Sequence, residues 1–258
     1  MSPKISALLM IYNEEGQIRD CLETVKWADE IVICDSFSTD RTIEICREYT
    51  DKIYRRKFDN FGNQKRWILT KPTCEWVLFV EADERFPKKL ADEIRYRLSL
   101  NEEYDGYWMP FKNYFLGKEM RSKNWVFSKI KLFKNGKGGW EDKLVHVNFV
   151  LDGKAGELEN PILHYPYPNM KVLLVKLGRF TNIEVEEILV RGKRLTLYNT
   201  LKSFLRIPVT FCRHYFLWRG YKDGYPGFVS TLLYSFYDVV VNIKYWVIRQ
   251  GWAKRNIR

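Results

Sequence analysis

The stretch WVLFVEADERFP, residues 76–87, joins an apolar run to a group of charges. Residues 76–80 are all apolar, and their number and composition predict a strand that is covered on both faces. The five residues that follow contain three acids and one arginine. These acids therefore stand at the end of a buried strand, where a solvated turn or a binding site could use them.

Strands and helices alternate around this stretch. The predicted strands cover residues 5–11, 30–35, 52–58 and 76–80. The predicted helices cover residues 13–28, 38–49, 62–71 and 88–98. Strands that are separated by helices need crossover connections, so this half of the chain predicts a mostly parallel α/β sheet.

The pattern changes after residue 104. Residues 104–120 and 128–140 are rich in aromatic side chains and are broken by glycines, which is typical of strands in a mixed sheet or in hairpins. Helical spacing returns from about residue 170. We therefore expect an α/β domain over residues 1–165 and a helical C-terminal extension over residues 166–258.

Composition is that of a globular protein with an uneven charge. The 258 residues are 46% hydrophobic and 29% charged, and the net charge is +11. Residues 195–258 hold ten Lys and Arg but only two acids, so the basic character belongs to this segment. The five cysteines are odd in number and widely spaced, which favours reduced core residues of a cytosolic protein.

Targeting and membrane-spanning segments are not expected. The N-terminus lacks a basic region followed by a small-residue cleavage site, so it does not predict a signal peptide. The longest late apolar stretch, residues 227–248, contains Asp238 and Lys244, and each would be costly at the centre of a bilayer.

Acids follow three of the predicted strands. Glu14 follows the first, Asp35 ends the second, and Glu81 and Asp83 follow the fourth. In an open parallel sheet the carboxyl ends of the strands form the ligand crevice, and converging carboxylates usually bind a cation or sugar hydroxyls. No glycine-rich phosphate loop follows the first strand. A nucleotide crevice that contains a divalent metal is one interpretation; helix caps or solvated loop acids, as at Asp40, are the other.

Three blocks resemble the inverting glycosyltransferase family 2, whose fold is GT-A. They are ALLMIYNEEGQIRDCLETV (7–25), ADEIVICDSFSTDRTIEI (28–45) and WVLFVEADERFP (76–87). Two later blocks, residues 144–167 and 219–228, resemble the branch of bacterial lipopolysaccharide core β-1,4-glucosyltransferases. The resemblance covers nearly the whole chain. It implies a Rossmann-like nucleotide-diphospho-sugar transferase with a mixed sheet and a helical extension.

The resemblance also implies roles for individual residues. It assigns the nucleotide sugar to seven positions: Tyr12, Asn13, Glu14, Asp35, Lys65, Arg66 and Glu81. It assigns Mg²⁺ or Mn²⁺ to Asp83, the last acid of the D-x-D position, and to the downstream His164. The chain departs from the family at Glu81, where the usual residue is Asp. That side chain is one methylene longer, and it is expected to reach a ribose hydroxyl or a metal-bound water.

The catalytic base is expected near residue 142. Inverting transfer needs a carboxylate that deprotonates the acceptor hydroxyl. The segment GGWEDKLVH (138–146) resembles the acidic acceptor-side motif of the family, which makes Asp142 the first candidate and Glu141 the second. Turn acids that follow two glycines are the alternative interpretation. The branch often has Glu where this chain has Val147, so the resemblance does not choose the base.

The C-terminal segment interleaves aromatic side chains with Lys and Arg. This composition is typical of helices that lie in a membrane interface and contact anionic lipid. Packing of the aromatics on the catalytic domain is an alternative. Nucleic acid is not an expected partner, because no recognition motif accompanies the cations.

These observations lead to one main hypothesis. The chain is expected to be a metal-dependent, inverting glycosyltransferase that moves a hexose, glucose from UDP-glucose, onto a glycolipid such as the lipopolysaccharide inner core. It is expected in the cytoplasm, peripheral on the cytosolic face of the inner membrane. A polyprenyl-phosphate glycosyltransferase and a non-catalytic module that binds anionic lipid are the alternatives.

Overall fold

The computed structural model describes residues 3–100, 102–141 and 148–250. The chain forms two compact units. The first contains Met1–Lys112 and Phe127–Tyr165, and the second contains Asn113–Val126 and Pro166–Arg258. The separate roles that were predicted for residues 1–165 and 166–258 stay a prediction.

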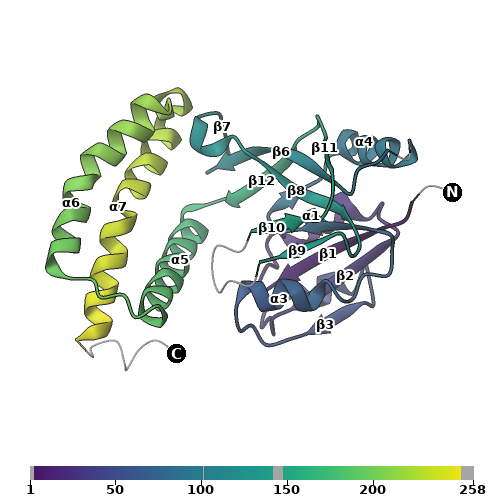
Figure 1. Cartoon of the computed structure of the whole chain (residues 1–258), viewed down its shortest axis with the longest axis horizontal. Coiled ribbons are helices and arrows are strands. Elements are labelled where there is room, and N and C mark those ends of the chain that lie inside the picture. The colour runs from purple at the N-terminus through teal and green to yellow at the C-terminus, as the bar shows by residue number, and fades with distance from the viewer. Residues whose placement is uncertain (1–2, 101, 142–147, 251–258) are drawn as a thin grey trace. The chain divides into compact units, whose positions relative to one another are not determined.

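Four parallel strands form the centre of the first unit (Figure 1). Their order across the sheet is β3 (Ile53–Arg55), β2 (Glu30–Asp35), β1 (Ile5–Ile11) and β4 (Trp76–Val80). All residues of β2 and β4 are buried, as expected for strands that are covered on both faces. The predicted parallel α/β sheet is therefore confirmed.

Short helices connect and cover these strands. They are α1 (Ile18–Val25), α2 (Thr42–Cys46), α3 (Phe61–Ile68) and α4 (Lys88–Ser99). In α1, the residues Ile18, Cys21, Leu22 and Val25 are buried, which is the helical spacing that the sequence shows. Helices α1 and α2 are shorter than predicted, because loops that follow β1 and β2 take up the first residues of both segments.

The sheet continues with antiparallel strands. Strand β8 (Ser128–Lys134) pairs antiparallel with β4, and β6 (Gly106–Phe115) pairs antiparallel with β8. The order then runs through β12 (Ile162–Tyr167) to β5 (Glu84–Arg85), which are antiparallel to each other. The smaller strands are β7 (Lys118–Met120), β9 (Gly138–Trp140), β10 (Phe149–Leu151) and β11 (Ala155–Glu157). The predicted mixed sheet is confirmed.

The second unit is mainly helical. It contains α5 (Met170–Val190), α6 (Leu197–Cys212) and α7 (Gly224–Arg249), and both α5 and α6 pack against α7. Between α6 and α7 lie a π-helical turn (Arg213–Leu217) and a 3-10 turn (Gly220–Asp223). None of the helices in the described ranges is both long and apolar enough to cross a membrane.

The cysteines are all free thiols. Cys21, Cys34 and Cys46 are buried, whereas Cys74 is partly exposed and Cys212 is exposed. The prediction of reduced core cysteines is therefore right for the first three and wrong for Cys212, which lies on the exposed side of α6.

Candidate active site and metal centre

The carboxyl ends of β2, β1 and β4 lie side by side along one edge of the sheet. Parallel pairing places Ile11 beside Asp35 and Leu9 beside Val80. Residues that follow the three strands therefore line the same edge, as the sequence predicted from the acids at the strand ends.

The loops after β1 and β2 bind each other. Asn13 adopts a left-handed backbone conformation with a φ of 53°, and its side-chain Oδ1 accepts a hydrogen bond of 2.8 Å from the Thr39 amide. Asp35 is buried, and its Oδ1 accepts a hydrogen bond of 3.0 Å from the Ser38 amide. Tyr12, which precedes Asn13, is exposed at this edge. These contacts hold two of the predicted nucleotide-binding residues on ordered loops.

The other acids of these loops make structural contacts. The Glu14 amide donates a hydrogen bond of 2.8 Å to Thr42 Oγ1, which fixes the Glu14 backbone at the end of β1. Asp40 Oδ1 accepts a hydrogen bond of 3.1 Å from the Thr42 amide at the start of α2. The N-cap of α2 is Arg41, however, so the interpretation of Asp40 as the capping residue is wrong, and its carboxylate instead holds the loop before the helix.

Three predicted residues converge beyond the end of β4. One ligand atom from each of Glu81, Asp83 and His164 lies within 4.8 Å of the other two. His164 Nε2 lies 3.6 Å from Asp83 Oδ1. Antiparallel pairing of β5 with β12 causes this approach, because His164 stands opposite Glu84 and the Tyr165 amide donates a 2.8 Å hydrogen bond to the Asp83 carbonyl.

This donor set fits a hard or borderline divalent cation. Two carboxylates and one imidazole are ligands that suit Mn²⁺, and carboxylates suit Mg²⁺. Neighbouring ligands of an octahedral ion with bonds of about 2.1 Å are about 3 Å apart, so small side-chain rotations would close the observed spacing. Glu81, Asp83 and His164 could therefore hold Mn²⁺ or Mg²⁺.

Two further charged residues, which sequence reasoning missed, lie against this cluster. Lys131 Nζ on β8 lies 2.6 Å from Glu84 Oε1 and 3.4 Å from Glu81 Oε1. The Lys131 ammonium lowers the pKa of Glu81 to about 2, whereas burial raises the pKa of Glu84. A signal was present in the sequence SKIKLFK, where Lys129 and Lys131 share one face of a strand whose residues 131–133 are buried.

Lys65 and Arg66 of α3 make different contacts. The Lys65 ammonium lies 5.1 Å from the ring centre of Phe79, and burial lowers the pKa of Lys65. Arg66 Nη1 instead donates a hydrogen bond of 3.1 Å to the Glu141 carbonyl. Lys65 interacts electrostatically with Glu81, and Arg66 holds the carbonyl of Glu141, which follows β9.

Of the two candidate bases, only Glu141 lies within the described residues. Glu141 follows β9, and its Oε2 accepts a hydrogen bond of 3.2 Å from Asn148 Nδ2. Asp142 and Val147, like His146, lie outside the described residues. Trp140 is buried against Phe79 and other aromatic rings, so it is a core residue.

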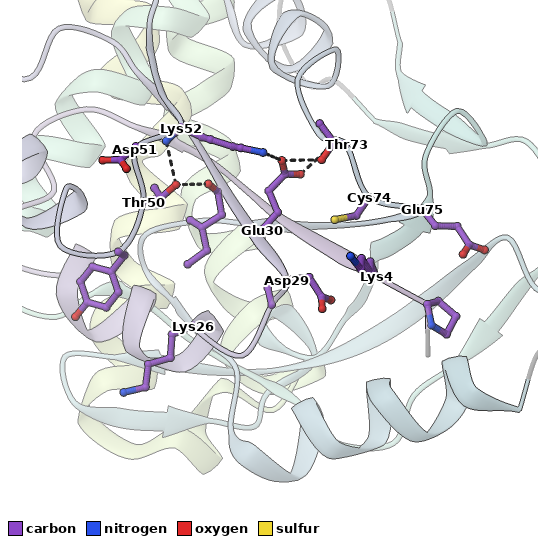
Figure 2. A pocket seen from close by; sticks show the side chains of 14 residues that line it. Lys4, Lys26, Asp29, Glu30, Thr50, Asp51, Lys52, Thr73, Cys74 and Glu75 are labelled. Carbon is purple, nitrogen blue, oxygen red and sulfur yellow. Dashed lines mark hydrogen bonds and ion pairs between the residues drawn. The ribbon is translucent and has the colours of Figure 1, made fainter. Parts of the chain in front are cut away.

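A cavity of about 840 Å³ lies at the opposite, amino-terminal edge of the sheet (Figure 2). Its buried acid is Glu30, whose carboxylate binds Lys52 Nζ, Ser6 Oγ and both the amide and the hydroxyl of Thr73. Both carboxylate oxygens are used by the chain itself. This acid is therefore part of the structural framework.

Comparison with known proteins identifies the family of the chain. The model of the family "Glycosyl transferase family 2" matches residues 6–151, which is more than half of the chain. The lipopolysaccharide core biosynthesis glycosyltransferase LpsC of Rhizobium meliloti (strain 1021) is 27% identical over 249 residues, which cover 92% of this chain and 91% of LpsC. The glycosyltransferase SunS of Bacillus subtilis (strain 168) is 35% identical over 97 residues, 36% of this chain and 23% of SunS.

Solved structures show a weaker likeness. TarS 1–349 of S. aureus is 15% identical with a TM-score of 0.47, and the match covers 96% of this chain and 92% of TarS. Glucosyl-3-phosphoglycerate synthase of Mycobacterium tuberculosis, in complex with Mn²⁺ and uridine-diphosphate-glucose, is 20% identical with a TM-score of 0.34 over 44% of each chain. The family match, with the topology described above, carries the assignment: the chain belongs to glycosyl transferase family 2, has the GT-A fold and is a glycosyltransferase related to a lipopolysaccharide core biosynthesis enzyme.

Proposed function

We propose that this chain transfers a hexose, glucose from UDP-glucose, with inversion onto a glycolipid of the lipopolysaccharide inner core. The observation that carries the proposal is the convergence of Glu81, Asp83 and His164 at the carboxyl edge of the parallel sheet. The nearly full-length match to LpsC supports the acceptor class. Mn²⁺ or Mg²⁺, held by these three side chains, would stabilise the charge of the leaving diphosphate.

The donor would lie along the loops that follow β1 and β2. Asp35 and Asn13 are fixed there by hydrogen bonds to residues 38 and 39, which suits them to bind the uracil and ribose. The half-buried Lys65 supplies a cation near Glu81 and can neutralise a phosphate. Tyr12 and Glu14 complete this end of the site as further donor-binding residues.

The chemistry of inversion requires one base. The base takes the proton of the acceptor hydroxyl while the hydroxyl oxygen forms a bond to the anomeric carbon. The bond from that carbon to the diphosphate breaks at the same time, and its electron pair leaves with UDP. We assign this base to Asp142, with Glu141 as the alternative. The hydrogen bond from Arg66 fixes the carbonyl of Glu141, the residue that precedes Asp142 in the sequence.

The base assignment can be tested by paired substitutions. Asp142→Asn removes the proton acceptor but keeps the size of the side chain, so transfer should fall about 10²- to 10⁴-fold while the KM for the donor changes little. Glu141→Gln serves as the matched control and should retain most activity. Steady-state kinetics with one donor and one acceptor decide the matter, and the opposite ranking would move the role to Glu141.

The donor and acceptor need a direct experiment. The purified chain is incubated with UDP-glucose, UDP-galactose or UDP-N-acetylglucosamine and with either deep-rough lipopolysaccharide or a polyprenyl phosphate, in the presence of Mn²⁺ or EDTA. We expect Mn²⁺-dependent transfer of glucose to lipopolysaccharide, with product linkage assigned by NMR. Transfer only to the polyprenyl phosphate would establish the alternative acceptor, and equal turnover in EDTA would reject the metal.

The surface of α6 supports a location at a membrane. Its exposed face carries six large apolar or aromatic side chains: Leu197, Tyr198, Leu201, Phe204, Leu205 and Val209. Leu205 is 76% exposed, whereas the buried residue of this helix is the polar Ser203. Soluble proteins normally bury the apolar side of a helix, so the inverted arrangement favours contact with lipid.

Charge favours an anionic bilayer as the partner of α6. Lys202 and Arg206 are exposed along the edge of the apolar face, and the whole segment 195–258 is strongly basic. An interfacial helix binds by burying apolar area and by attraction between its cations and acidic headgroups. We therefore place the enzyme peripherally, on the cytosolic face of the inner membrane, where a soluble nucleotide sugar meets a lipid-anchored acceptor.

Vesicle flotation tests the contact with lipid. Leu201→Glu/Leu205→Glu should reduce binding to phosphatidylglycerol vesicles at least tenfold, because it places two charges on the apolar face. The matched control is Tyr96→Glu/Leu100→Glu, which changes two exposed apolar residues near the end of α4. Binding that survives the α6 substitution would reject this surface, as would light scattering that shows α6 buried in a dimer.

A further inference from the structure

A buried acid and a buried lysine lie directly beneath the metal-binding turn. Glu84 begins β5 and is 1% exposed, and Lys131 on β8 is 3% exposed. Lys131 Nζ and Glu84 Oε1 are 2.6 Å apart. The rings of Phe79 and Phe111 flank the ammonium at 5.2 Å and 5.8 Å from their centres, so the pair lies in a largely apolar wall.

The second oxygen of Glu84 closes the turn. Glu84 Oε2 accepts a hydrogen bond of 3.0 Å from the Glu81 amide, while the Glu84 amide donates one of 2.9 Å to the Glu81 carbonyl. Residues 81–84 are thereby held twice, once by the backbone and once by the Glu84 side chain. Asp83 lies inside this turn, so the orientation of its side chain depends on both of these hydrogen bonds.

Lys131 also contacts Glu81 from the buried side of the turn. Its Nζ lies 3.4 Å from Glu81 Oε1, and the Glu81 side chain is 41% exposed on its other side. One ammonium is therefore shared between a fully buried carboxylate and a carboxylate that faces the candidate metal position. Any change in the buried partner changes how strongly Lys131 attracts Glu81.

Stability alone explains this pair poorly. Transfer of two charges into a protein interior costs several kcal/mol per ion, and a well-packed apolar pair of similar volume is often as stable. A buried ion pair that binds the backbone of a ligand-bearing turn does what apolar side chains cannot do, because it fixes the direction of that turn.

We propose that Glu84 and Lys131 are positioning residues, which hold the Glu81–Asp83 turn so that Asp83 and His164 converge on one divalent cation and Glu81 stays within reach of it. The proposal rests on the proposed metal-dependent function. It adds a supporting layer to that site: Glu84 fixes the turn, and Lys131 divides its charge between Glu84 and Glu81.

Glu84→Gln tests the proposal most directly. The amide is nearly isosteric, but it cannot both accept from the Glu81 amide and balance the Lys131 ammonium, which then draws Glu81 away from the cation. Mn²⁺ affinity in the presence of UDP, measured by EPR, should fall about tenfold to one hundredfold, as for other residues that support metal ligands. Hydrogen exchange of the Glu81 amide should become faster.

A compensating variant separates positioning from a merely structural role. Glu84→Gln/Lys131→Met removes both charges, so no ammonium remains to withdraw Glu81, and Mn²⁺ affinity should recover in part. The matched control is Glu30→Gln, which breaks the ion pair between a buried acid and the half-exposed Lys52 at the opposite edge and should change Mn²⁺ affinity less than twofold. Circular dichroism confirms that each variant is folded.

The outcomes distinguish this inference from the proposed function. Wild-type Mn²⁺ affinity together with unchanged exchange of the Glu81 amide in Glu84→Gln overturns it, as does an equal loss in Glu30→Gln. If the wild-type chain itself binds no Mn²⁺ with UDP, the proposed metal site fails. Hydrogen exchange then decides alone: faster exchange at residues 81–84 in Glu84→Gln keeps the positioning of the turn, and unchanged exchange rejects it.

Discussion

The two edges of the parallel sheet each contain a buried carboxylate beside a lysine, but they use the pair differently. At the amino-terminal edge, both oxygens of Glu30 accept hydrogen bonds from the chain, from Lys52, Ser6 and Thr73. At the carboxyl-terminal edge, Lys131 and Glu84 support a turn whose acids converge on a histidine.

Cavity size does not distinguish the two edges as sites. The cavity of about 840 Å³ lies at the amino-terminal edge, beside an acid whose oxygens are already occupied. At the other edge, ligand atoms of three side chains lie within 4.8 Å of one another. The chemistry of the side chains, and not the volume of the cavity, is therefore the basis for proposing that a cation and a nucleotide sugar bind at the carboxyl-terminal edge.

The largest expected effect comes from the carboxyl-terminal edge. Asp83→Asn removes a charged ligand atom at the centre of the candidate metal site, so transfer should fall at least 100-fold, about 2.7 kcal/mol of transition-state stabilisation. The melting temperature without metal should stay within about 2 °C of the wild type. Kinetics and thermal melts measure both, and an active Asp83→Asn enzyme would remove the contrast between the edges.

A smaller effect, on stability and not on catalysis, is expected at the amino-terminal edge. Glu30→Gln removes the charge from a carboxylate that is 8% exposed, but its partner Lys52 is half exposed, so water screens part of the attraction. The free energy of unfolding should fall by about 2 kcal/mol. Urea unfolding gives this value, and kcat should stay within twofold of the wild type if this edge is structural.

The smallest effect is the pH dependence of the same group. Burial opposes the charged form of Glu30, but hydrogen bonds from Lys52, Ser6 and Thr73 outweigh it and lower the pKa from 4.5 to about 2. Its contribution to stability is thus complete above about pH 4.5 and is lost as the pH falls towards about 2. The stability difference between wild type and Glu30→Gln should shrink across this window, and a constant difference would contradict the assignment.

Much of this architecture was predictable from the sequence. Buried strands read as apolar runs, and Ile18, Cys21, Leu22 and Val25 show the helical period, so the alternating pattern predicts the parallel half correctly. The acids at the strand ends predicted a site at the carboxyl edge of the sheet, because parallel strands end together at that edge.

Other parts of the site needed the structure. The family resemblance names His164, but periodicity could not predict its approach to Asp83. That approach depends on pairing of β5 with β12, and β5 has only two residues, too few to give a periodic signal. Glu84 was missed because the burial of an acid cannot be read from its neighbours in the sequence. Lys131 was missed because a lysine in a strand is usually a solvated edge residue.

The exposed face of α6 has a practical consequence. Cys212 is exposed at the end of this helix, eight residues after Phe204 and therefore on the same side, while Cys21, Cys34 and Cys46 are buried. With Cys74 replaced by serine, a nitroxide attached to Cys212 would be a single native-position probe. Its accessibility to oxygen and to an aqueous nickel complex would test whether α6 enters the bilayer as proposed and, if it does, how deep it lies.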